Sequence, residues 1–131
     1  MSRYVILCGG RDHPPFTRSE VLWLERLYAT NPFAELIVGS HQGADLFGHE
    51  WAQSRGITTM TFWANWQRDG RAAGPVRNTR MLLHIMGESF RVSHNVLTLA
   101  LVVAFPGGKG TADMCHQASF AGVEVLAWPP P

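Results

Sequence analysis

Short apolar runs alternate along this chain with segments of helical periodicity, and this alternation is the feature that most limits how it can fold. The runs cover residues 3–8, 34–40, 57–63, 97–105 and 123–128. Two of them, 3–8 and 97–105, are almost continuously apolar, which is typical of parallel strands buried on both faces. Strands that alternate with helices predict an α/β fold, a single doubly wound domain with a mostly parallel five-stranded sheet over residues 1–131.

Four segments between these runs carry helix signals. The first begins at Thr17, which forms the capping-box pattern with Glu20 three residues later. The other predicted helices cover 43–56, 76–88 and 111–122. A polar, glycine-bearing loop is expected over 64–75, and the closing prolines at 129–131 are expected to form a short exposed tail.

The charge balance argues against a polyanion as the main partner. The chain of 131 residues has 11 Lys and Arg against 10 Asp and Glu, a formal net charge of +1. Binding of duplex DNA normally shows as a strongly basic surface, so nucleic acid is not the expected partner. A small anionic ligand needs only local positive charge and remains compatible with this composition.

Cysteine, histidine and hydropathy patterns indicate no metal, no cofactor and no membrane partner. Cys8 and Cys115 fit no metal-ligand spacing, and the histidines follow no ligand pattern. Cys8 is expected to be a small buried residue. No segment approaches the roughly 20 apolar residues of a membrane span, and the first apolar run is too short for a signal sequence. We expect a cytoplasmic protein with reduced thiols.

Three loops rich in glycine and charge follow predicted strands. They cover 9–13, 39–45 and 106–113. In doubly wound folds, ligands bind beyond the carboxyl ends of the strands, where the strand order reverses. These loops are therefore expected to meet at one site, to which the first contributes Gly9, Gly10 and Arg11.

The loop after the fourth strand has the composition of a phosphate site. Gly107, Gly108 and Gly110 leave backbone N–H groups accessible, and the chain then enters a helix at Thr111, where the helix dipole favours an anion. The alternative is an ordinary strand-to-helix turn capped by Thr111. No Lys-Ser/Thr pair follows the last glycine, so this is not an ATP-hydrolysing P-loop.

Two aspartates follow glycine-rich turns and have two interpretations each. Asp113, expected in the first turn of its helix, either complements the helix dipole or accepts hydrogen bonds from sugar hydroxyls. Asp45 follows Gly39 and Gly43, and this segment either binds a second part of the same ligand or caps the next helix.

The segment around Gly74 and Pro75 adds basic and aromatic candidates. Arg77 and Asn78 follow the proline, and arginine binds phosphate through two N–H groups, although exposed arginines are often only solvated. Trp63 and Trp66 either stack on a base or, as is commoner for aromatic residues at strand ends, pack in a core or interface.

Five motifs occur in order along nearly the whole chain: CGGRD, GSHQGAD, WANWQRDG, AGPVRNTRM and FPGGKGTADM. In this combination the chain resembles the DUF2493 family, the YspA-like branch of the SLOG superfamily of Rossmann-like nucleotide-binding domains. The resemblance implies a Rossmann-like domain whose Gly107 to Thr111 loop binds the 5′-phosphate of a small nucleotide.

Other members of the superfamily sharpen the expected chemistry. In the Lonely Guy phosphoribohydrolases, a similar glycine-rich loop with an acidic residue resembles Pro106 to Asp113, and an Arg-Lys pair resembles Arg77 and Asn78. This implies catalytic roles for Asp113 and Arg77 in hydrolysis of the N-glycosidic bond of a nucleoside monophosphate, and a homodimer. GSHQGAD also resembles a turn of the DNA-processing protein DprA, which implies single-stranded DNA binding, a function that needs a basic groove. A nucleotide hydrolase, a non-catalytic nucleotide sensor and a single-strand binder are the alternatives left open.

Overall fold

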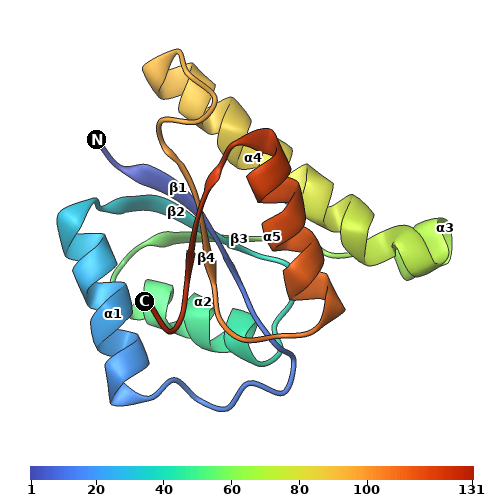
Figure 1. The fold of residues 1–131 in the computed structure, drawn as a ribbon, viewed down its shortest axis with the longest axis horizontal. Coiled ribbons are helices and arrows are strands. Elements are labelled where there is room, and N and C mark those ends of the chain that lie inside the picture. Colours follow the sequence, from blue (N-terminus) through green and yellow to red (C-terminus); the bar gives the residue numbers. More distant parts are fainter.

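A five-stranded parallel sheet forms the centre of the protein, as described by a computed structural model of residues 1–131. The strand order is β3-β2-β1-β4-β5, and every neighbouring pair is parallel. The strands are β1 (Arg3–Cys8), β2 (Phe33–Val38), β3 (Thr58–Thr61), β4 (Ala100–Ala104) and β5 (Glu124–Ala127) (Figure 1). The predicted doubly wound α/β fold is confirmed, and its sheet is wholly parallel.

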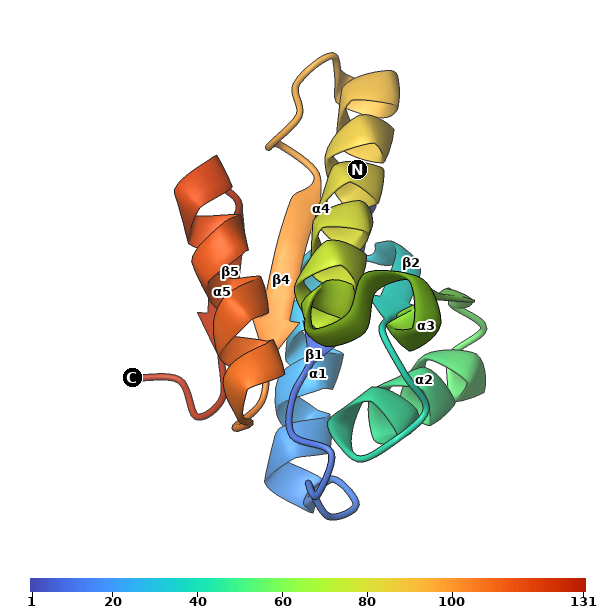
Figure 2. The ribbon, with the colours of Figure 1, turned by 90° about the vertical axis from the view of Figure 1, so that its right-hand side faces the viewer.

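Helices cover both faces of the sheet (Figure 2). They are α1 (Arg18–Thr30), α2 (Ala44–Ser54), α3 (Trp66–Asp69), α4 (Ala73–Ser93) and α5 (Lys109–Ala121), with a 3₁₀ turn η1 (Gly70–Ala72) between α3 and α4. One buried cluster joins the sheet to α1 and α2, and a second joins it to α4 and α5. None of these helices combines the length and apolar character needed to cross a bilayer.

The continuous apolar run of β1 follows from this two-sided burial. Val5 and Leu7 belong to the core beneath α1 and α2, whereas Tyr4, Ile6 and Cys8 belong to the core beneath α4 and α5. Because successive side chains of a strand point to opposite faces, both sets must be apolar when both faces are covered.

The predicted capping box at the start of α1 is confirmed. The Glu20 backbone N–H donates to Thr17 Oγ1 at 3.2 Å, and the Thr17 backbone N–H donates to Glu20 Oε1 at 2.8 Å. These two bonds satisfy N–H groups that have no acceptor within the helix.

The prediction of a loop over 64–75 is wrong. Most of this segment is helical: α3, η1 and the first turn of α4 follow one another, and α4 extends from Ala73 to Ser93 rather than over 76–88. Pro75 is tolerated as the third residue of α4, because an N–H in the first turn has no intrahelical acceptor to lose.

The start of α5 also differs from the prediction. The helix begins at Lys109 with Gly108 as its N-cap, two residues before the expected start at Thr111. Asp113 is consequently the fifth residue of α5. It lies beyond the first turn of the helix, whereas the sequence predicts it within the first turn. Its side chain is thereby displaced from the helix end, and Thr111 is not the cap.

Candidate functional site

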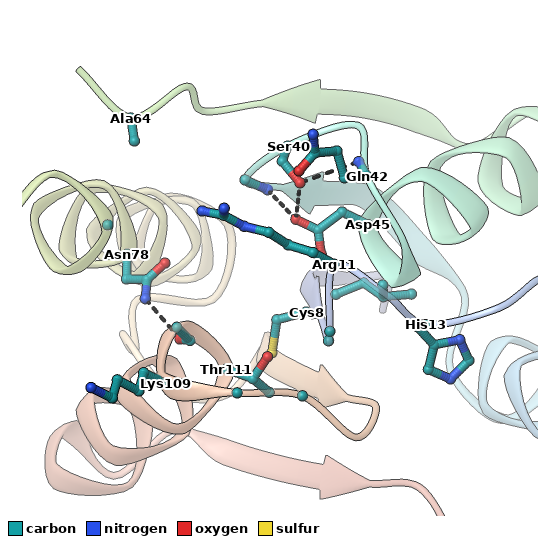
Figure 3. A pocket seen from close by; sticks show the side chains of 18 of the residues that line it. Cys8, Arg11, His13, Ser40, Gln42, Asp45, Ala64, Asn78, Lys109 and Thr111 are labelled. Carbon is teal, nitrogen blue, oxygen red and sulfur yellow. Dashed lines mark hydrogen bonds between the residues drawn. The ribbon is translucent and has the colours of Figure 1, made fainter. Parts of the chain in front are cut away.

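A cleft of about 1230 Å³ lies beyond the carboxyl ends of β1, β2 and β4. The strand order reverses between β1 and β4, so this is where a doubly wound sheet opens to ligands. Eleven residues singled out from the sequence line the cleft: Gly9, Gly10, Arg11, Gly39, Asp45, Arg77, Asn78, Gly107, Gly108, Gly110 and Thr111. Figure 3 shows part of this lining, with Arg11 extended across the opening.

Gly10 joins the three glycine-rich loops to one another. Its N–H donates to the carbonyl of Pro106 at 2.9 Å, and its carbonyl accepts the N–H of Ala44 at 3.1 Å. The sequence predicts that Gly10 contacts the ligand, but its backbone N–H already donates a hydrogen bond to Pro106. This residue holds the loops after β1 and β4 and the start of α2 in a common arrangement.

Gly43 does not line the cleft, and its contacts are those of a structural glycine. Its φ is +55°, and a Cβ there would lie 2.1 Å from the Gly10 carbonyl oxygen. A side chain is excluded by both the backbone conformation and the contact. Gly43 therefore allows α2 to begin directly against the loop that follows β1.

The remaining glycines divide into packed and open positions. A Cβ at Gly107 would lie 2.3 Å from Thr111 Oγ1, and one at Gly39 would lie 2.5 Å from the Arg77 guanidinium. A Cβ at Gly108 or Gly110 would meet no atom within 4 Å. Of these four glycines, only Gly108 and Gly110 open directly onto space that a ligand can enter.

The N–H groups next to these open glycines have no acceptor within the helix. The helical hydrogen bonds of α5 begin with Ala112, whose N–H donates to the Gly108 carbonyl at 3.0 Å. The preceding N–H groups, from Lys109 to Thr111, carry the positive end of the helix dipole at the edge of the cleft.

Asp45 places a buried carboxylate in the cleft. Its residue is 8% exposed, and its Oδ2 accepts the Gly39 N–H at 3.3 Å and the Ser40 hydroxyl at 3.0 Å. Burial raises the pKa of Asp45 to about 6, although the Ser40 hydrogen bond and the Arg77 charge oppose that rise. The Ser40 backbone N–H also stabilises the ionised carboxylate, and Asp45 lines the cleft, where water or a ligand can reach it.

This raised pKa predicts that Asp45 destabilises the fold at neutral pH. The ordinary pKa of 3.8 applies when the chain is unfolded, so the folded state binds more protons between about pH 4 and 6. The cost is therefore full above the folded pKa and is relieved as the pH falls toward 4. We expect Asp45→Asn to raise the free energy of unfolding by about 1–2 kcal/mol near pH 8 and to have little effect near pH 4.

Chemical denaturation at the two pH values measures this difference. The exposed Asp12, which also lines the cleft, supplies the control variant Asp12→Asn. A destabilised Asp45→Asn variant at pH 8 would show that the ionised carboxylate contributes favourably to folding.

Arg77 and Asn78 connect α4 to the loop after β2 and to the start of α5. Arg77 donates through Nη1 to the Gly39 carbonyl and through Nε to Asn78 Oδ1, the latter at 3.0 Å. Asn78, which is 2% exposed, donates through Nδ2 to the Gly110 carbonyl at 3.2 Å. The N–H groups on Nη2 of Arg77 donate to no protein acceptor, and Arg77 lines the cleft.

Asp113 faces α4 and does not line the cleft. Its Oδ2 accepts hydrogen bonds from Asn78 Nδ2 at 2.9 Å and from Gln117 Nε2 at 2.8 Å. The acidic side chain thus orients the Asn78 amide that holds the Gly110 carbonyl. The catalytic role predicted for Asp113 remains a prediction, and the observed contacts are those of a positioning residue.

Several cleft residues did not enter the set predicted from the sequence. They are Leu7, Cys8, Asp12, His13, Pro14, Ser40, His41, Gln42, Ala64, Gly74, Met81, Pro106 and Lys109. Most of them are neighbours of predicted residues in the same loops, and this proximity in sequence is the one signal that could have identified them. Trp63 and Trp66, for which stacking on a base was one of two predicted alternatives, also line the cleft. Contact with Cys115 and burial raise the pKa of the Cys8 thiol, so it lies in the cleft as a neutral group.

His13, which also lines the cleft, contacts Glu20. Its Nε2 lies 3.0 Å from Glu20 Oε2, and both side chains are nearly buried. This contact links the loop after β1 to the capping box of α1.

Comparison with known proteins gives one family match and one structural likeness. Residues 3–68, from β1 into α3, match the YspA, cpYpsA-related SLOG family. The crystal structure of DNA processing protein A (DprA) from Streptococcus pneumoniae is similar, with a TM-score of 0.48 and 14% identity. The similarity covers 95% of this chain but 58% of that one, so the chain spans little more than half the length of this neighbour.

No curated protein sequence matches the chain. The family match carries the assignment, because it spans half of the sequence and includes the loops after β1 and β2 that line the cleft. The protein therefore belongs to the YspA, cpYpsA-related SLOG family.

Proposed function

We propose that this protein binds a small nucleotide in the cleft, with its 5′-phosphate against the start of α5. The observation that carries the proposal is the pair of open glycines, Gly108 and Gly110, beside N–H groups that have no acceptor within α5. Membership of the SLOG family supports a nucleotide-related role in general terms.

The charges around the cleft support an anionic ligand. Arg11, Arg77 and Lys109 line the cleft, against the carboxylates of Asp12 and Asp45. Arg77 is half-buried and held by two hydrogen bonds, so little side-chain freedom is lost when its remaining N–H groups bind an anion. The positive end of the helix dipole would also stabilise a phosphate at the start of α5.

We further propose that the bound nucleotide is hydrolysed at its N-glycosidic bond, with Asp45 as the catalytic carboxylate. Its raised pKa still leaves it mainly ionised at neutral pH, as a general base requires. Asp45 would take a proton from water whose oxygen attacks C1′. The C1′–N bond breaks and its electron pair goes to the base nitrogen. This nitrogen then receives the proton that Asp45 took from water, which regenerates the carboxylate and yields the free base and ribose 5-phosphate. The negative charge of Asp45 also favours the positive charge that develops on the sugar.

Replacing Gly108 with Val is expected to weaken nucleotide binding at least tenfold while the fold remains intact. The new side chain would enter open space in the cleft, where the phosphate must approach the backbone. A thermal-shift panel of nucleoside monophosphates identifies the ligand, and calorimetry then measures its affinity for both proteins.

Gly87→Val is the matched control for this experiment. Gly87 lies in α4 outside the cleft, and a Cβ there also meets no atom within 4 Å. Equal nucleotide affinity of the Gly108 variant and the wild type, with both cooperatively folded, would refute the phosphate site.

A nucleotide sensor is the alternative to the hydrolase, and it uses the same phosphate site. The two differ in base release from AMP, GMP, CMP, UMP and their deoxy forms. Binding without release from any of them would leave the binding function and remove the catalytic one.

A further inference from the structure

Two tryptophans at the cleft expose most of their surface. Trp63 is 58% exposed and Trp66 is 54% exposed, and both line the cleft. Large apolar side chains that gather at a concave surface mark a binding site more often than scattered exposed ones do. Their shared position in the cleft therefore requires an explanation that burial in the core does not supply.

Each indole has a neighbour within the protein. The rings of Trp63 and His41 have centroids 5.0 Å apart, and His41 Nε2 is hydrogen-bonded to Thr61 Oγ1 at 2.8 Å. Trp66 is the first residue of α3, and its ring lies 3.9 Å from where a Cβ of Gly74 would be. A planar ligand that stacks on Trp63 would thus meet a ring that already contacts His41, which lowers the entropic cost of ordering it.

Trp63 lies on the side of the cleft away from the loop after β4, because its ring contacts His41 of the loop after β2, and β2 and β4 lie on opposite sides of β1. In Figure 3, Ala64, which stands between the two tryptophans in sequence, lies across the cleft from Thr111 and Lys109. The Arg11 side chain extends through the space between these two sides. A nucleotide with its phosphate at the start of α5 can therefore direct its base toward Trp63, and Trp66 lines the same cleft.

We infer that Trp63 and Trp66 stack on the base of the bound nucleotide and make the cleft selective for purines. This inference rests on the proposed phosphate site. Stacking on tryptophan accepts any base, because every base has a π face, but a bicyclic purine covers more of the indole surface than a pyrimidine. The structure thus assigns phosphate binding to one side of the cleft and base recognition to the other.

The experiment compares AMP, CMP and base-free ribose 5-phosphate by calorimetry. Wild type should bind AMP at least about tenfold more tightly than ribose 5-phosphate, with CMP between them. The Trp63→Leu/Trp66→Leu double variant should lose this difference and bind ribose 5-phosphate about as well as wild type does. Leu keeps an apolar side chain but removes the π face.

Phe120→Leu is the matched control, because Phe120 is 89% exposed on α5 and lies outside the cleft. The single Trp63→Leu variant provides a second test if the double variant is poorly folded. Equal wild-type affinities for AMP and ribose 5-phosphate, or an AMP preference that survives in the variants, would overturn the stacking site and leave the phosphate site standing. Failure of wild type to bind either compound would overturn both. Dissociation of an oligomer in the double variant, with AMP affinity unchanged, would identify the tryptophans as interface residues instead.

Discussion

Asp45→Asn is expected to reduce base release by about a hundredfold or more while nucleotide binding is largely retained. The substitution keeps the size of the side chain but removes the charge that accepts a proton from water and stabilises the developing positive charge on the sugar. Steady-state base release and calorimetry on the same preparations measure the two effects separately. Because this variant is expected to be more stable than wild type at pH 8, unfolding cannot explain a loss of activity there.

The pH profile and a second variant test the same assignment. If Asp45 is the base, wild-type base release should rise as the pH increases through about 6, where this carboxylate ionises. Asp113→Asn supplies the comparison, since Asp113 contacts Asn78 and Gln117 and does not line the cleft. A hundredfold loss in the Asp113 variant with normal turnover by the Asp45 variant would reverse the two roles and return the catalytic carboxylate to Asp113.

Gly43→Ala is expected to lower the free energy of unfolding by about 2–4 kcal/mol, the largest stability effect that we predict. A Cβ would lie 2.1 Å from the Gly10 carbonyl and 2.5 Å from the Arg11 carbonyl, and the φ of +55° disfavours any side chain. Relief of the contact would move α2 away from the loop after β1 and break the bond between the Ala44 N–H and the Gly10 carbonyl. Urea denaturation measures the change.

Gly108→Ala is the matched control for this effect. A Cβ at Gly108 meets no atom, so the free energy of unfolding should change by less than about 1 kcal/mol. Equal stability losses in the two variants would contradict the division of the glycines into packed and open positions.

Periodicity predicted the elements well where burial dictates residue type. β1 was predicted at its observed bounds, and the capping box of α1 was found because its two residues lie within one turn. The loop prediction for 64–75 is wrong because glycine and proline signal a loop only where they interrupt helical hydrogen bonds, and Pro75 lies where α4 has no N–H bond to lose. Glycine and proline restrict local conformation, but their effect depends on their position within a helix.

The sequence by itself determined the alternating fold, the edge of the sheet where a ligand can bind, and the loops that meet there, because these follow from local periodicity and from the geometry of parallel strands. Only the tertiary structure decided which residues of those loops face the cleft. Gly43 packs against Gly10 and Asp113 faces Asn78, contacts between residues far apart in the chain. Because α5 begins at Lys109, Asp113 lies beyond the first turn of the helix. Asp45 is buried but still lines the cleft. Such orientations depend on the packing of distant segments, which local patterns do not specify.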